Sequence, residues 1–265
     1  HDVCTNGIGY VDMMFKTDSI APEQIPYLGL LKSVLGYVDT QAHTYGELFN
    51  EINASTGGIS CGVEVFDRAD STEEFQALFS VRGKALYPKL GFLFKMAEEI
   101  LGTSKVEDTK RLYEIVAAVK SRAQASLTGA GHSTAVLRAT SYSSPMAAFQ
   151  DEMAGIGYYQ FIEKLEKDFD QQKDLIVQEL RKLMKMILRP ENFMISYTGE
   201  RESLEEVKKL AAHIRQGLNT EPVEKSEKKL ICTRKNEGFK TSGQVQFVAQ
   251  TGNFKKKGLE YTGAL

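Results

Sequence analysis

Three side chains able to bind a metal ion could share one face of a helix near the N-terminus. His43, Glu47 and Glu51 are spaced four residues apart, and on a helix this spacing stacks them on one side. A catalytic zinc site, however, needs three good ligands, usually with two histidines, and an open position. No second histidine is close in the sequence. We therefore interpret the three side chains as a solvent-exposed helix face.

A second candidate for chemistry is the segment Gly131-His132-Ser133-Thr134-Ala135, which places a serine beside a histidine. It has a partial similarity to the G-x-S-x-G turn of serine hydrolases, in which a strand precedes the serine and a helix follows it. The residues before Gly131 have helical periodicity instead. A serine hydrolase that uses Ser133 is thus a remote alternative, and a glycine break between two helices explains the segment more simply.

Composition excludes several other classes of protein. The chain has 33 Lys+Arg against 35 Asp+Glu, and this balance argues against a general binder of nucleic acid or membrane surfaces. No apolar run reaches the length of about 18 residues that would cross a membrane. Cys4, Cys61 and Cys232 are far apart and odd in number, which excludes a disulfide framework and a C-x-x-C zinc site. We predict a cytoplasmic protein without nucleic-acid or membrane partners.

The elements that would position these residues follow an α+β order. Alternation predicts strands at 5–17, 59–66, 75–86 and 193–197, with the second and third paired as a hairpin. Apolar stripes predict helices at 19–35, 45–53, 90–101, 112–128, 134–143, 146–154, 158–165, 176–188 and 202–218. The predicted fold is an antiparallel-rich mixed sheet packed against several helices.

The last part of the chain has a different composition. Residues 219–229 are polar and charged with one proline, so they are the predicted linker after a domain at 1–218. Val245, Phe247 and Ala249 then alternate as a strand would. We expect 230–265 to be the truncated start of a second, similar domain.

Six segments that follow one another in the sequence carry a family resemblance. They are TNGIGYVDMMF, IPYLGLLKSVLGYVDTQAHTYGELFNEINASTGGIS, VRGKALYPKLGFLFKMAEEIL, GAGHSTAVLRA, GIGYYQFIEKLE and NEGFKTSGQVQFVAQTGNF. Together they closely resemble the C-terminal half of the presequence-protease branch of the pitrilysin/insulinase-like zinc metallopeptidases. The resemblance covers almost the whole chain, and the combination is more specific than any one motif.

The resemblance implies a long polypeptide of four related domains whose two halves close around a peptide chamber. In that family the first domain carries an H-x-x-E-H motif and a distal glutamate, which bind Zn²⁺ and activate water. This chain would be the third domain and the start of the fourth. The equivalent motif positions are then Leu28, Leu31 and Lys32, none of which can bind a divalent cation. No metal, cofactor or catalytic residue is expected here, and Zn²⁺ would lie in the N-terminal half.

The implied function is that of a non-catalytic, chamber-forming fragment of a zinc metalloendopeptidase that degrades unstructured peptides. Its partners would be the N-terminal half of the same polypeptide and the peptide substrates. Strand edges would extend a bound peptide, and two glycine-rich turns would face the chamber. Those turns make Gly131, His132, Gly155 and Gly157 the predicted peptide-chamber residues, although glycines that simply end helices explain them equally well. The alternative is a structural or interaction subunit from a catalytically inactive relative.

Overall fold

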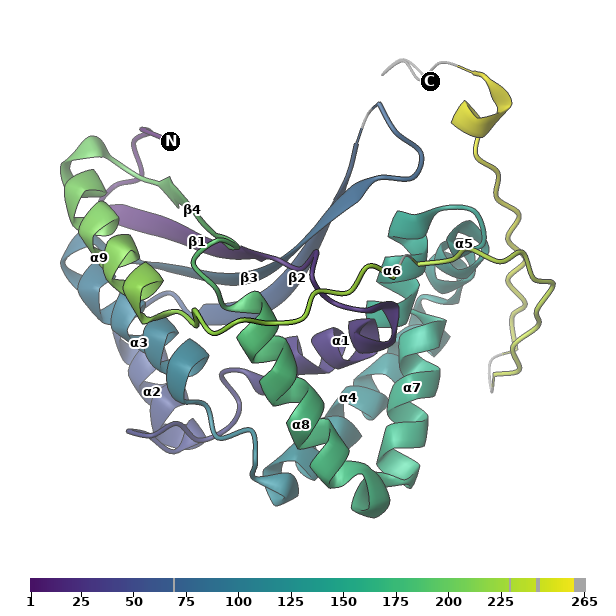
Figure 1. The fold of residues 1–265 in the computed structure, drawn as a ribbon, viewed down its shortest axis with the longest axis horizontal. Coiled ribbons are helices and arrows are strands. Elements are labelled where there is room, and N and C mark those ends of the chain that lie inside the picture. The colour runs from purple at the N-terminus through teal and green to yellow at the C-terminus, as the bar shows by residue number, and fades with distance from the viewer. Residues whose placement is uncertain (69, 229, 242–243, 260–265) are drawn as a thin grey trace.

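A computed structural model describes residues 1–68, 70–228, 230–241 and 244–259 (Figure 1). Its sheet has the order β2-β3-β1-β4 and contains β1 (Ile8–Lys16), β2 (Ile59–Asp67), β3 (Phe75–Leu86) and β4 (Phe193–Thr198). All of these pairings are antiparallel, and β2 and β3 form the predicted hairpin. The α+β class is confirmed, but the expected mixed sheet is not: among the described residues, the parallel contact is the isolated bridge between Asp2 and Gly199.

Helices account for most of the remaining described chain. They are α1 (Ile25–Val34), α2 (Tyr45–Ser55), α3 (Leu90–Thr103), α4 (Thr109–Gly129), α5 (Gly131–Ser141), α6 (Pro145–Ala154), α7 (Ile156–Lys167), α8 (Phe169–Ile187) and α9 (Leu204–Gly217). Several begin at side chains that accept a hydrogen bond from the first helical turn, such as Asp108 before α4 and Ser144 before α6. Pro26 lies in the first turn of α1, where its missing N–H costs little. None of the described helices combines the length and apolarity needed to cross a bilayer.

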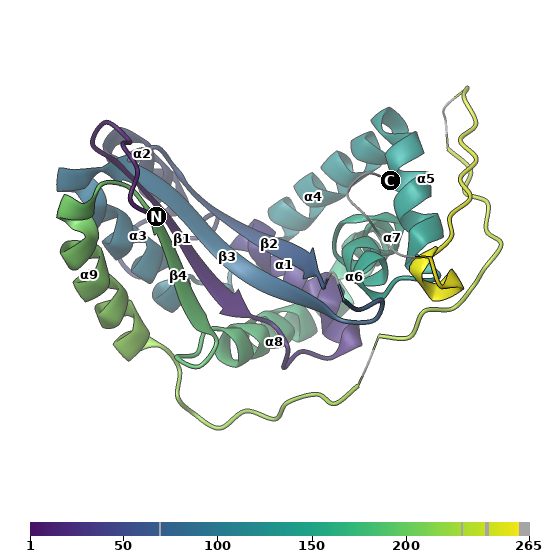
Figure 2. The same cartoon turned by 90° about the horizontal axis from the view of Figure 1, so that it is seen from above.

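The sheet has one covered face and one face without helices. Val11, Met13 and Phe15 of β1 and Phe79 and Val81 of β3 alternate onto the covered face and are buried. Helices α1, α3 and α9 pack on that side, whereas no helix of the described chain lies on the opposite side (Figures 1 and 2). Helices α4 to α7 gather beside the sheet near β2. The core thus lies between the sheet and one helical layer.

After α9 the chain continues as an extended segment that passes the sheet and reaches α5 (Figure 2). Its described residues, 219–228, 230–241 and 244–259, contain one short 3-10 turn at Lys255–Lys257, and we call them the tail. The strand predicted at 245–249 is wrong, because a strand needs a neighbour to pair its backbone groups and no described strand lies beside this one. The division at 219–229 and the second domain at 230–265 stay predictions, and residues 229, 242–243 and 260–265 lie outside the described chain.

Candidate functional site

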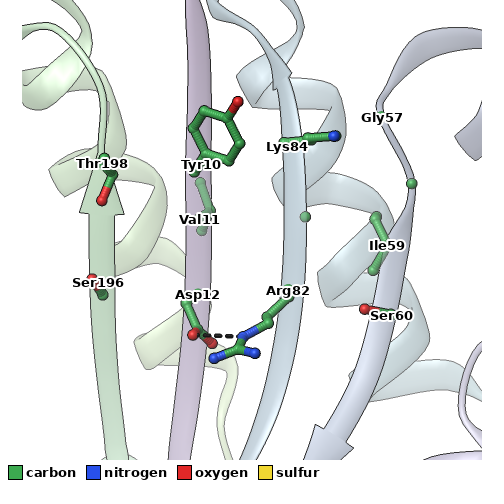
Figure 3. A pocket seen from close by; sticks show the side chains of 12 residues that line it. Tyr10, Val11, Asp12, Gly57, Ile59, Ser60, Arg82, Lys84, Ser196 and Thr198 are labelled. Carbon is green, nitrogen blue, oxygen red and sulfur yellow. Dashed lines mark hydrogen bonds and ion pairs between the residues drawn. The ribbon is translucent and has the colours of Figure 1, made fainter. Parts of the chain in front are cut away.

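Polar side chains that alternate with the core residues line the helix-free face of the sheet. On β1 these are Tyr10 and Asp12, and on β3 they are Arg82 and Lys84. Arg82 lies opposite Asp12 and Lys84 lies opposite Tyr10, so the four side chains form two neighbouring cross-strand rows (Figure 3). Ser196 of β4 extends the row of Asp12. We call the surface formed by these five residues the open face.

The two basic side chains of the open face differ in their partners. Arg82 Nε donates to Asp12 Oδ2 at 2.8 Å, and Arg82 Nη2 also pairs with Glu64 of β2. Lys84 has no carboxylate within ion-pair distance in the part of the chain that the structure describes. Its methylene groups lie over Gly57, where a Cβ would come within 2.6 Å of Lys84 Cγ. The Lys84 ammonium is therefore held above the sheet and available to a ligand.

A cavity of ≈ 570 Å³ lies against this part of the sheet. Its lining includes the hydroxyl-bearing residues Tyr10, Ser60, Ser196 and Thr198 together with Lys84 (Figure 3). These groups can donate to and accept from peptide bonds and carboxylates. No group of three or more histidine, cysteine, aspartate or glutamate side chains that could hold a metal ion occurs among the described residues. The arrangement is suited to binding a polar ligand.

The degenerate motif positions lie on α1, on the covered side of the sheet. Leu28 is 0% exposed and Leu31 is 1% exposed, so both side chains are part of the core. Lys32 is half-buried, and burial lowers the pKa of its ammonium because the charged form loses solvation. All three positions therefore contribute to packing, and the two leucines do so completely.

His43 does not share a helix face with Glu47 and Glu51, so that prediction is wrong. Helix α2 begins only at Tyr45, because Thr44 caps it: the Thr44 side chain accepts from the Glu47 N–H, and the Glu47 carboxylate accepts from the Thr44 N–H at 2.9 Å. His43 turns the other way, with its Nδ1 2.7 Å from the carboxylate of Glu99 on α3. The predicted ligands are thus divided between a helix cap and an inter-element ion pair.

Gly131 and His132, two of the predicted chamber residues, lie in the first turn of α5 and contact the tail. A Cβ on Gly131 would lie 2.7 Å from ring carbons of Phe247, and the His132 and Phe247 ring centroids are 6.0 Å apart. Ser133 is exposed in the same turn, and helix α4 precedes it across Ala130. The strand that a nucleophile turn requires is replaced by a helix, so the serine hydrolase alternative loses its structural basis.

Gly155 and Gly157, the other predicted chamber residues, surround a buried carboxylate. Asp151 of α6 is 1% exposed and accepts the backbone N–H groups of Ile156 at 3.0 Å and Gly157 at 3.1 Å. A Cβ on Gly155 would lie 2.9 Å from the Asp151 Cα, so glycine is needed where the chain passes. Gly155 ends α6, whereas Gly157 lies inside α7 instead of in the predicted break. Peptide contact by the four chamber residues stays a prediction.

Arg138 of α5 is the centre of a cluster that the sequence did not indicate. Its Nη1 donates to Asp151 Oδ2 at 2.6 Å, and its Nε and Nη2 donate to the two carboxylate oxygens of Glu237 in the tail at 2.8 and 3.2 Å. The Tyr142 hydroxyl donates to Glu237 Oε2 at 2.5 Å. No periodicity marks this set, because its members come from separate elements of the chain.

Proton affinities in this cluster follow from those contacts. Burial alone would lower the pKa of Arg138, but its hydrogen bonds to Glu237 and Asp151 outweigh burial and raise the pKa. The hydrogen bond from Arg138 lowers the pKa of Glu237. Burial raises the pKa of Tyr142, and its bond to Glu237 adds to this effect. Arginine and tyrosine therefore remain protonated donors to an ionised carboxylate at neutral pH.

A second cavity, of ≈ 1160 Å³, lies between the tail and helices α4, α5 and α7. Gly131 and Arg138 of α5 line one side, and Glu237 and Phe247 line the tail side. This cavity is where two of the predicted chamber residues and the Arg138 cluster come together. The open face and this cavity are the two candidate binding regions of the described chain.

A family model described as Peptidase M16, subfamily C, associated matches residues 1–165. The chain belongs to this family. Protein HypA of Clostridium perfringens is 35% identical over 265 residues, which are 100% of this chain and 27% of that protein. Presequence protease 1, chloroplastic/mitochondrial, of Arabidopsis thaliana is 26% identical over 267 residues, which are 100% of this chain and 24% of that protein.

Solved structures agree with the fold of this peptidase-associated chain. A conserved protein from Enterococcus faecalis superposes with a TM-score of 0.57 at 13% identity, over 80% of this chain and 48% of that one. A peptidase M16 inactive domain from Pseudomonas fluorescens superposes with a TM-score of 0.53 at 14% identity, over 87% of this chain and 50% of that one. The resemblance to a presequence-protease-like fragment is therefore confirmed, and the chain spans about a quarter of its curated relatives' length.

Proposed function

We propose that this chain is a non-catalytic, chamber-forming part of a zinc-dependent peptidase that degrades unstructured peptides. Membership of a peptidase-associated family supports the proposal. The observation that carries it is a contrast within one domain. The sheet presents a polar, helix-free face with an available ammonium at Lys84, while the motif positions Leu28 and Leu31 are closed into the core.

The rest of the polypeptide would supply the chemistry. Its N-terminal half would bind Zn²⁺ and would be the partner against which this chain closes. Two relatives that match over only 27% and 24% of their own length support such a larger protein. A peptide would lie on the open face, and strands β2 and β4, which each pair on one side in the described sheet, would extend it by backbone hydrogen bonds.

The cytoplasmic location stays a prediction. Arabidopsis thaliana and Yarrowia lipolytica relatives are named chloroplastic/mitochondrial and mitochondrial presequence proteases, at 26% and 28% identity. Those names describe the relatives and fit a parent that acts in an organelle equally well. Fractionation of the source cells, with detection of the whole polypeptide, distinguishes the two locations.

A structural or interaction subunit is the second candidate. One observation favours it: a solved structure of the same fold is described as an inactive domain of peptidase M16. In that case the whole polypeptide would bind peptides or partners without cleaving them. The open face would then serve binding alone.

Peptide cleavage by the whole polypeptide and by the 265-residue chain tests both candidates. We expect the whole polypeptide to cleave an unstructured peptide, to stop when a chelator removes its metal, and to recover with zinc. The chain alone is expected to cleave nothing with or without zinc. Zinc-dependent cleavage by the chain would contradict the proposal, and an inactive whole polypeptide would favour the second candidate.

A further inference from the structure

Arg138 and Tyr142 present three donors to one carboxylate. Arg138 Nε and Nη2 lie 2.8 and 3.2 Å from the two oxygens of Glu237, and the Tyr142 hydroxyl lies 2.5 Å from one of them. The Phe239 ring of the tail also faces the guanidinium, at 5.7 Å from its centroid. A two-pronged contact from arginine with a third donor is a specific geometry for a carboxylate.

The receiving side of this contact is built independently of Glu237. Asp151 is 1% exposed and fixes Arg138 through Nη1 at 2.6 Å. The Asp151 carboxylate is itself held by the N–H groups of Ile156 and Gly157. Arg138 would therefore keep its orientation if Glu237 left, and its Nε and Nη2 donors would still face outward.

The group that fills the site belongs to the least embedded part of the described chain. Glu237 lies in the tail, where most described side chains from 230 to 241 are exposed and no helix or strand is formed. Side chains such as Ile231, at 84% exposure, contribute almost nothing to the core. Separating Glu237 from Arg138 would thus break few other contacts.

We propose that Arg138 and Tyr142 form a carboxylate-binding site, which Glu237 occupies from within the chain and which a carboxylate of an acidic peptide occupies in its place. The adjoining cavity of ≈ 1160 Å³ between the tail and α4, α5 and α7 gives the rest of that peptide room. Glu237 acts as an internal competitor, because its attachment to the same chain gives it a high effective concentration. That the ligand is a peptide rests on the proposed function, whereas the carboxylate chemistry rests on the contacts alone.

Binding of short fluorescent peptides to the 265-residue chain tests the site. One peptide carries a single glutamate and an amidated C-terminus, a second carries glutamine instead, and a third carries glutamine with a free C-terminal carboxylate. We expect Glu237→Ala to bind the glutamate peptide about tenfold more tightly than the wild-type chain, because the internal competitor is gone. The third peptide distinguishes a side-chain carboxylate from a chain-terminal one as the preferred source.

Matched variants connect the effect to Arg138. Glu224→Ala removes a charge from the same tail away from the cluster and is expected to leave the affinity unchanged. Arg138→Lys combined with Glu237→Ala keeps a cation beside Asp151 but loses the two-pronged contact, so the gain should disappear. Tyr142→Phe combined with Glu237→Ala, which retains the ring, should lose part of the gain. Thermal unfolding verifies that each variant is folded.

Two results would overturn the site. One is that Glu237→Ala binds the glutamate and glutamine amide peptides equally well. The other is that the gain survives Arg138→Lys. Neither result depends on peptide cleavage, so the proposed function can fail while this site stands, and the site can fail while the whole polypeptide remains an active peptidase.

Discussion

Helix α1 and helix α5 both contain a basic side chain near the core, but they treat it in opposite ways. On α1, Lys32 is half-buried without an ion pair among the described residues, between leucines that fill the core. On α5, Arg138 is 12% exposed and lies between the carboxylates of Asp151 and Glu237. In the first helix packing dominates, and in the second the charges are retained and fully paired.

This difference indicates where function is retained in the chain. A buried ion pair is expensive to desolvate and stabilises less than apolar residues of similar volume would. The retention of Arg138 and Asp151 therefore fits a role in recognition. The leucines of α1, by contrast, are explained entirely by stability. Substitutions that move each helix toward the other's behaviour test this comparison.

The largest effect is expected from placing a charge in the α1 core. Leu31→Glu buries a carboxylate at a position that is 1% exposed, and it should lower the free energy of unfolding by about 4 kcal/mol or more. Urea denaturation measures the loss. Leu31→Met, which keeps the volume and the apolarity, should cost less than about 1.5 kcal/mol. Similar losses for the two variants would show that α1 is less tightly packed than described.

A somewhat smaller loss is expected from removing the buried carboxylate of α6. Asp151→Ala leaves Arg138 with Glu237 alone and leaves two backbone N–H groups without their acceptor, at a cost of about 3 kcal/mol. Asp151→Asn keeps one oxygen acceptor and should cost less. Urea denaturation of both variants measures the difference, and an unchanged stability in Asp151→Ala would contradict the supporting role of this residue.

Adding one methyl group near Asp151 should have an intermediate effect. Gly155→Ala brings a Cβ to 2.9 Å from the Asp151 Cα, and the backbone shift this requires should cost about 2 kcal/mol. Gly46→Ala is the matched control, because nothing lies within 4 Å of a Cβ there and alanine favours the helix α2. Thermal unfolding compares the two, and equal behaviour would argue against the close approach at Gly155.

The smallest effect is a gain in stability on α1. Lys32→Met removes a poorly solvated charge and should raise the free energy of unfolding by about 1 kcal/mol at neutral pH. Burial places the pKa of Lys32 in the folded chain below its ordinary value of 10.5, so the wild-type chain gains stability as pH rises through the folded pKa toward 10.5. The difference between the variants should therefore narrow with rising pH.

Thermal unfolding across that pH range measures this difference. Lys110→Met, at an exposed position of α4, controls for the loss of a lysine charge at the surface. A difference between Lys32→Met and the wild-type chain that stays constant with pH would contradict the assignment.

Local pattern was enough to predict most of the fold. The alternation of Val11, Met13 and Phe15 predicts β1 because one face of the strand is buried, and the same reasoning predicts β3. The predicted strand at 245–249 has equally good alternation, but pairing depends on a neighbouring strand, which local pattern cannot reveal. His43 was placed on a helix because spacing alone ignores the cap at Thr44, which starts α2 after it.

The candidate sites were less accessible to sequence reasoning. The two glycine turns drew attention to 128–133 and 155–157, and these lie beside the cavity under the tail and around Asp151. The contact between Arg138 and Glu237 joins residues 99 positions apart, and neither residue belongs to a motif. Such pairs are fixed by tertiary packing, so only the structure identifies them.

The central claim is that this chain contributes peptide contacts rather than metal chemistry. Lys84→Glu in the whole polypeptide tests it most directly, by measuring kcat/KM for an acidic unstructured peptide together with bound zinc. Reversing the available charge of the open face should lower kcat/KM by about fivefold through repulsion, with the zinc content unchanged and Lys110→Glu as control. An unchanged kcat/KM, or a loss of zinc, would contradict the claim.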